Sequence, residues 1–178
     1  MDTVRVLLRH GASAGRPLGS GDTALHRAVL TNDWSRLTDH WSIANAQGAT
    51  SMGHQGTIRL LLKHGAAVNA RSTRGVTPLL MAAAMAGYVS LGVVRELLAA
   101  GADLDLVDSG GDNAEAIVHG KLDNDVAECG IPAFPELCRR TGAVEAFQAL
   151  LADVRAAGSW KRYVCLLYTS PSPRDRVQ

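Results

Sequence analysis

One six-residue motif occurs three times along the chain, twice almost unchanged and once in a looser form. Two leucines, a basic residue, His, Gly and Ala follow one another at residues 7–12 and again at 61–66, and Leu-Leu-Ala-Ala-Gly-Ala stands at 97–102. Two leucines suit the buried last turn of a helix, and a glycine soon after them can adopt the left-handed conformation that ends one. A chain that reuses such a unit is predicted to form a stack of repeated helical units.

A second recurring piece stands ahead of two of these helices. Glycine, any residue and threonine, followed by an apolar run, occur at 21–23 and at 75–77. Thr23 and Thr77 are placed to cap a helix, a contact that stabilises it by about 1 kcal/mol, and Pro78 suits the first helical turn. With both pieces in order, the chain resembles the ankyrin repeat family, which opens its units with Gly-x-Thr-Pro-Leu-His and closes them with Leu-Leu-x-x-Gly-Ala.

This resemblance covers most of residues 1–108, and it implies an all-α repeat solenoid of stacked helix-turn-helix units with short hairpin fingers. Gly65 follows Gly11 by 54 positions and Gly101 follows Gly65 by 36, against a family period of about 33. The second unit is therefore expected to carry an insertion of about twenty residues. The predicted units are a partial repeat at 1–15, a repeat at 16–70 with its insertion at about 33–52, a repeat at 71–105 and a degenerate capping repeat at 106–158.

The inserted stretch, Asp33 to Met52, has a helical pattern of its own. Trp34, Leu37, Trp41 and Ala44 fall at helical spacing. A short helix folded back on the array is favoured over an arm that binds a partner. A third hypothesis is that the stretch is an unspliced or misassembled segment, because its removal would bring the unit close to the family length.

The match decays after Asp108, where a fourth unit is predicted to cap the stack. Its opening is expected at 111–118, and residues 129–140, which contain two prolines, are interpreted as an irregular connection. An apolar stripe at helical spacing predicts its second helix. The stripe consists of Val144, Phe147, Leu150, Leu151 and Val154.

Both ends carry signs of an incomplete sequence. Met1 falls in the middle of a repeat, so the natural protein is expected to begin earlier, and residues 159–164 are expected to start a truncated element. Residues 165–178 resemble the translation of an adapter used in sequencing libraries, and we expect them to be non-native. The competing interpretations are a disordered Ser/Pro tail and a phosphorylation site at Ser170 or Ser172.

Composition and charge limit the kinds of partner. The net charge of +1 and the pI of about 7.8 give no broad attraction for nucleic acid, so a DNA or RNA partner is not expected. The uncharged stretch from Gly75 to Val94 is long enough to span a bilayer, but the repeat pattern accounts for it as two short helices with a turn near Gly87. Because no secretory signal is recognised and three cysteines make no disulfide framework, we expect a cytoplasmic protein. A monomer is expected, although the sequence leaves the oligomeric state open.

No chemistry is predicted from the titratable residues. The glycine-rich run at 15–23 has Asp22 where a phosphate loop needs lysine, and Cys129, Cys138 and His119 match no usual zinc spacing. The resemblance makes His26 a structural residue that bridges backbone groups between repeats, a role that Leu80 cannot take in the next unit. We therefore predict no catalytic residue, metal, cofactor or small-molecule substrate.

Function is expected on the surface that the repeats leave free. The stretch 70–74 carries two arginines without a nearby acid, and the stretch 103–108 carries three acids between apolar residues. The resemblance implies a non-enzymatic protein-interaction module, a scaffold or adaptor that binds an unidentified protein through its fingers and concave helix face. The alternative is a targeting array of a larger enzyme or membrane protein whose other domain is missing. The candidate partner-binding residues are Arg71, Thr73, Arg74, Val76, Ala84, Met85, Val107, Ser109 and Asp112.

Overall fold

The N-terminal part of the chain folds into short helices stacked in two rows, and a longer helix follows. The computed structural model describes residues 2–29, 55–86, 89–120 and 135–169 of the 178-residue chain. Residues 114–120 are also helical, and the described residues contain no β-strand. The labelled helices are α1 (Asp2–Arg9), α2 (Ala24–Val29), α3 (Gln55–Lys63), α4 (Pro78–Ala84), α5 (Leu91–Ala99), α7 (Pro135–Ala157) and α8 (Trp160–Thr169).

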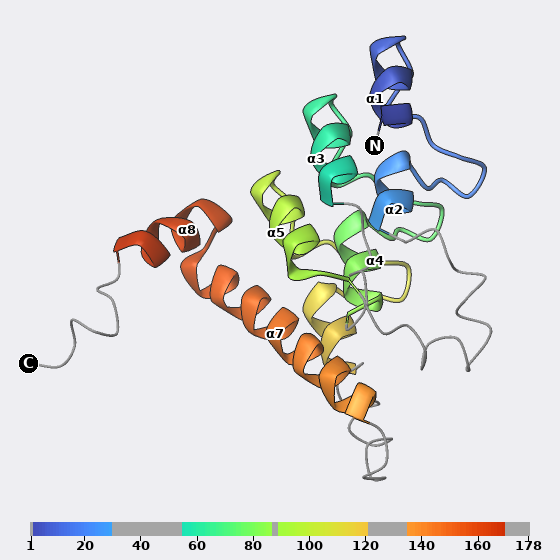
Figure 1. Cartoon of the computed structure of the whole chain (residues 1–178). Helices are drawn as coiled ribbons and strands as arrows, with labels where there is room; N and C mark the ends of the chain where they lie inside the picture. The colour runs from blue at the N-terminus through green and yellow to red at the C-terminus, as the bar shows by residue number, and fades with distance from the viewer. Residues whose placement is uncertain (1, 30–54, 87–88, 121–134, 170–178) are drawn as a thin grey trace, which may run out of the picture.

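The two rows correspond to the first and second helices of successive repeats. Helix α2 packs against α3 and α4 against α5 within the repeats, while α2 contacts α4 and α3 contacts α5 between them. Figure 1 shows α1, α3 and α5 in one row and α2 and α4 in the other. The predicted all-α repeat solenoid is therefore confirmed. The predicted insertion at 33–52 lies outside the described residues.

The glycine of each six-residue motif ends its helix as predicted. Gly11, Gly65 and Gly101 have φ angles of +85°, +82° and +91°, the left-handed region that glycine enters without strain. In each copy the N–H of the following alanine donates to the carbonyl of the first leucine over 3.0 Å. The same local sequence thus produces the same helix end three times.

Burial of the motif leucines differs between the copies. Leu61 and Leu97 are 3% and 0% exposed, whereas Leu7, at the same motif position, is 55% exposed. The expectation that both leucines of each copy are buried is wrong for Leu7. Helix α1 stands at the outer end of its row, so no described helix covers its outer side (Figure 1).

The C-terminal part is more helical than the sequence predicts. The five residues of the apolar stripe are all buried in α7, with Phe147 only 1% exposed. However, α7 begins at Pro135, so residues 135–140 are helical and not an irregular connection. Proline is tolerated at the first helical position because that residue has no intrahelical N–H bond to lose. Helix α8 runs across the boundary expected between Val164 and Cys165.

Local hydrogen bonds start the helices and join neighbouring repeats. Thr77 caps α4 by accepting a bond from the N–H of Leu80 at 3.2 Å. The Nδ1 atom of His26 lies 3.1 Å from the backbone nitrogen of Thr23, and its Nε2 atom lies 3.0 Å from the carbonyl oxygen of Val76. Because a backbone N–H can only donate, Nδ1 is the acceptor and Nε2 carries the proton that bonds Val76. His26 is therefore the structural bridge that the resemblance implies.

Candidate functional site

Three short turns of the same geometry project between the helix pairs. We call residues 18–22 finger 1, residues 72–76 finger 2 and residues 108–112 finger 3. In each, the first N–H donates to the fifth carbonyl at 2.8, 2.9 and 3.1 Å, and the fourth residue, a glycine, donates to the first carbonyl at 2.8, 2.9 and 3.2 Å. The three glycines have φ between +72° and +88°. These turns are the hairpin fingers expected from the sequence.

The fingers are hydrogen-bonded to one another in register. The backbone N–H of Thr73 and its hydroxyl both donate to the carbonyl of Ser20, at 3.2 and 2.9 Å. The N–H of Ser109 donates to the carbonyl of Arg74 at 3.0 Å. A Cβ atom at Gly21 would lie 2.6 Å from the nitrogen of Thr73, so glycine is needed for this approach. The fingers consequently form one continuous edge.

Most of the candidate binding residues lie in or next to the fingers, and two lie at the far end of α4. Arg71, Thr73, Arg74, Val107, Ser109 and Asp112 are exposed in or next to fingers 2 and 3. Ala84 and Met85 lie at the end of α4, where Ala84 is exposed and Met85 is partly buried. Val76 is partly buried against the core, and its carbonyl accepts bonds from Ser72 and His26. The structure therefore brings the finger residues together and gives Val76 a structural role.

Arg71, directly before finger 2, and Arg74, within it, differ in how their side chains are held. The Nη2 atom of Arg71 donates to the carbonyl of Val107 at 2.7 Å. A Cβ atom at Gly75 would lie 2.8 Å from this Nη2, so the guanidinium fits because Gly75 has no side chain. The side chain of Arg74 is exposed. In the described part of the chain, neither arginine pairs with a carboxylate.

The three acids at residues 103–108 each form a hydrogen bond or an ion pair within the protein. Asp108 accepts bonds from the N–H groups of Gly110 and Asp112 at 2.8 and 3.2 Å. Asp103 accepts from the N–H of Asp105 at 2.9 Å. The carboxylate of Asp105 pairs with Arg155 of α7 at 2.9 Å. These acids therefore maintain the turns and their contact with α7, and they form no isolated acidic spot.

A column of first-helix residues completes this side of the molecule. Arg27, Met81 and Ile117 each stand three positions after the first residue of their helix. Arg27 is exposed, and the other two are partly buried. These residues occupy equivalent positions, four residues after Thr23, Thr77 and Asn113. The column becomes visible in the sequence only when the units are aligned on those three residues.

Among the described residues, the ion pairs lie outside the fingers, and two of them join helices. Arg59 of α3 binds Glu96 of α5, and its Nε atom lies 3.2 Å from Oε2. The hydrogen bond from Arg59 holds the pKa of Glu96 below its usual value, although partial burial acts in the opposite direction. The same bond raises the pKa of Arg59. Arg155 donates to Glu115 at 2.6 Å, and this bond raises the pKa of Arg155.

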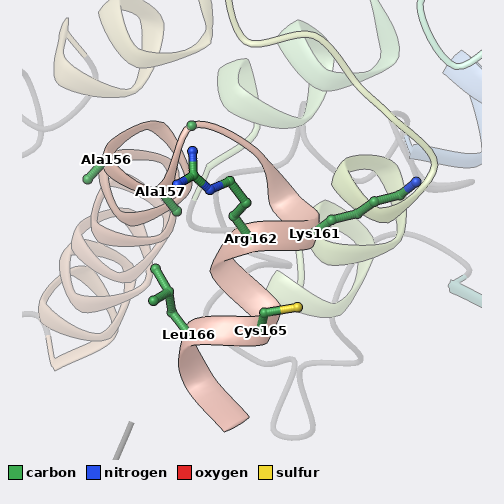
Figure 2. A pocket seen from close by; sticks show the side chains of 7 residues that line it. Ala156, Ala157, Lys161, Arg162, Cys165 and Leu166 are labelled. Atoms are coloured by element: carbon green, nitrogen blue, oxygen red, sulfur yellow. The ribbon is translucent and has the colours of Figure 1, made fainter. Parts of the chain in front are cut away.

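A shallow hollow lies between the end of α7 and helix α8 (Figure 2). Leu166 extends toward α7, whereas Lys161 points away from it (Figure 2). Because Cys165 and Leu166 belong to the stretch that resembles translated adapter, we assign this hollow no function. Among the described residues, no group of three or more His, Cys, Asp or Glu could hold a metal ion. No helix within the same part of the chain combines the length and apolar character needed to cross a bilayer.

Comparison with known families agrees with this geometry. Residues 41–108 match the family model described as ankyrin repeats (3 copies). A search of curated proteins gave no match. The matched stretch contains α3, finger 2, α4 and α5, and it ends at Asp108, the first residue of finger 3.

Proposed function

We propose that this chain, whose residues 41–108 belong to the ankyrin repeat family, is a non-enzymatic module that binds a protein partner through its fingers and first helices. Ankyrin repeats generally mediate protein–protein interactions. The module would act as a scaffold or adaptor, with the partner lying across several repeats at once.

The observation that carries this proposal is the hydrogen-bonded register of the fingers. Thr73 is bonded to Ser20, and Ser109 is bonded to Arg74, so three turns distant in sequence keep a fixed spacing. A surface that is ordered before binding loses less conformational entropy when a partner binds. The stacked fingers therefore offer the partner a rigid edge.

The side chains on the fingers and first helices suit protein recognition. Arg27 and Arg74 are exposed, and Met81 and Met85 are only partly buried. Arginine and methionine are enriched at protein interfaces, and the flexible methionine side chain adapts to irregular shapes. The surface thus combines cations with adaptable apolar groups.

Site-specific cross-linking tests the proposal. A photoreactive amino acid would replace Arg27 or Ser109 on the proposed face, or Lys63 or Arg95 on the second helices, in the otherwise unchanged chain. All four positions are exposed. After irradiation in an extract of the source cells, adducts of one defined mass should form from positions 27 and 109 and not from 63 and 95. Equal adduct formation from both pairs would contradict a binding face on the fingers and first helices.

A further inference from the structure

The guanidinium of Arg71 is held in place without a carboxylate. Its Nη2 atom donates to the carbonyl of Val107 and lies next to Gly75, which has no side chain. This bond uses one of the five N–H donors of a guanidinium. Arg71 is exposed, so donors remain available toward solvent.

A second cation, Arg74, stands three residues later, within finger 2. The backbone of Arg74 is fixed from both sides, because its N–H donates to Ser72 Oγ at 3.3 Å and its carbonyl accepts from Ser109. Its side chain is exposed and has no ion pair with another described residue. Two like charges so close in the chain repel each other, and an anion that both contact relieves this repulsion.

The acids at residues 103–108 do not supply that anion. Asp103, Asp105 and Asp108 are already bonded to backbone N–H groups or to Arg155. Asp112 is exposed in finger 3, and within the described residues no ion pair joins it to Arg71 or Arg74. The positive charge of finger 2 therefore faces outward.

We propose that Arg71 and Arg74 bind a carboxylate of an acidic peptide segment in the partner, which rests on the proposed binding function. A guanidinium can donate two parallel hydrogen bonds to one carboxylate, a geometry that lysine cannot match. Val107 holds Arg71 through its carbonyl and is itself 38% exposed. An apolar residue next to the partner's Asp or Glu packs on this valine. The recognised chemistry is an acidic residue beside an apolar one.

A peptide array tests this inference. The probe is a set of 12-residue peptides in which every sequence exists with Glu, Gln, Lys or phosphoserine at the same positions, each beside a leucine. The unmodified chain should retain the Glu forms about tenfold or more better than the Gln forms, and the Lys forms least. Arg71→Glu combined with Arg74→Glu should reverse the order of the Glu and Lys forms.

The control changes the net charge equally at another place. Lys63→Glu combined with Arg95→Glu replaces two exposed cations of α3 and α5 and should leave the order of the peptides unchanged. The circular dichroism spectrum and the unfolding midpoint of both double variants establish that they fold.

Several results would overturn the inference. These are equal retention of Glu and Gln forms, retention of no Glu form, a stronger preference for phosphoserine, or the same reversal in the control variant. If cross-linking at residues 27 and 109 still captures a partner while the array shows no preference for Glu, the binding face stands and only its acidic specificity fails. If neither experiment detects binding at this face, the proposed function fails as well.

Discussion

The imidazole of His26 lies 3.0 Å from the carbonyl oxygen of Val76, a residue 50 positions further along the chain. The ring is fully buried, and its other nitrogen accepts the N–H of Thr23. One side chain thus fixes both the start of its own helix and the position of the next finger. The stack depends on such contacts because each repeat is too small to bury its apolar side alone.

Replacing His26 by leucine should therefore destabilise the array. The variant leaves the N–H of Thr23 without its buried acceptor, which costs about 1–3 kcal/mol. Urea denaturation followed by circular dichroism measures the loss. The exposed neighbour Arg27, changed to alanine, is the control and should shift stability by less than about 0.5 kcal/mol. An equal effect of the two changes would contradict the bridging role.

Alanine at Gly21 should be more harmful than alanine at Gly65. Both positions have left-handed backbones, with φ of +75° and +82°, so both variants have a strain of about 1–2 kcal/mol. Only at Gly21 does the new methyl meet the nitrogen of Thr73, at 2.6 Å, whereas nothing lies within 4 Å at Gly65. We expect Gly21→Ala to lose at least about 1 kcal/mol more, as measured by denaturation. Equal losses would mean that fingers 1 and 2 are not in close contact in solution.

Replacing the first leucine of the six-residue motif should lower stability by different amounts in two repeats. Leu97 is fully buried, so Leu97→Ala is expected to lower stability by about 2–5 kcal/mol. Leu7 is 55% exposed, so Leu7→Ala should lower it by less than about 1 kcal/mol. Thermal and urea unfolding of the two variants provide the comparison. A large loss for Leu7→Ala would show that the outer side of α1 is covered in solution.

The ion pair between Arg59 and Glu96 should make stability depend on pH. Because its folded-state pKa is lowered from the ordinary value of 4.5, Glu96 stabilises the fold above that value. The stabilisation is lost as the pH falls through the lower folded pKa. Arg59→Gln should therefore reduce the urea midpoint at neutral pH, and this reduction should become smaller as the pH falls below 4.5. A difference that persists unchanged in acid would exclude ionisation of Glu96 as its source.

Local signals explain why so much of the repeat region could be predicted. The caps at Thr77, the proline after it and the glycines that end the helices act within a few residues of themselves. The finger turns likewise depend on one glycine each. Such features need no knowledge of the rest of the fold, so the order of motifs was sufficient to identify the solenoid.

Contacts between distant segments could not be predicted in the same way. The stretch 103–108 shows three acids in the sequence, but the partner of Asp105 is Arg155 of α7, which lies beyond the region of clear repeats. The exposure of Leu7 depends on which helices surround α1, which the motif itself does not contain. The early start of α7 reflects a long helix that the prolines alone did not reveal. The pairing of charges around finger 3 therefore could not be predicted from the motifs.

The bonds that join the fingers come mainly from the main chain. Ser20 and Arg74 contribute their carbonyl groups, and Thr73 and Ser109 contribute their N–H groups. Substitutions at Arg74 or Ser109 therefore leave the donors and acceptors of the stack in place. Selection can change the residues that face a partner while the scaffold beneath them stays constant, so descendants of one such gene can diverge in what they bind without having to evolve a new fold.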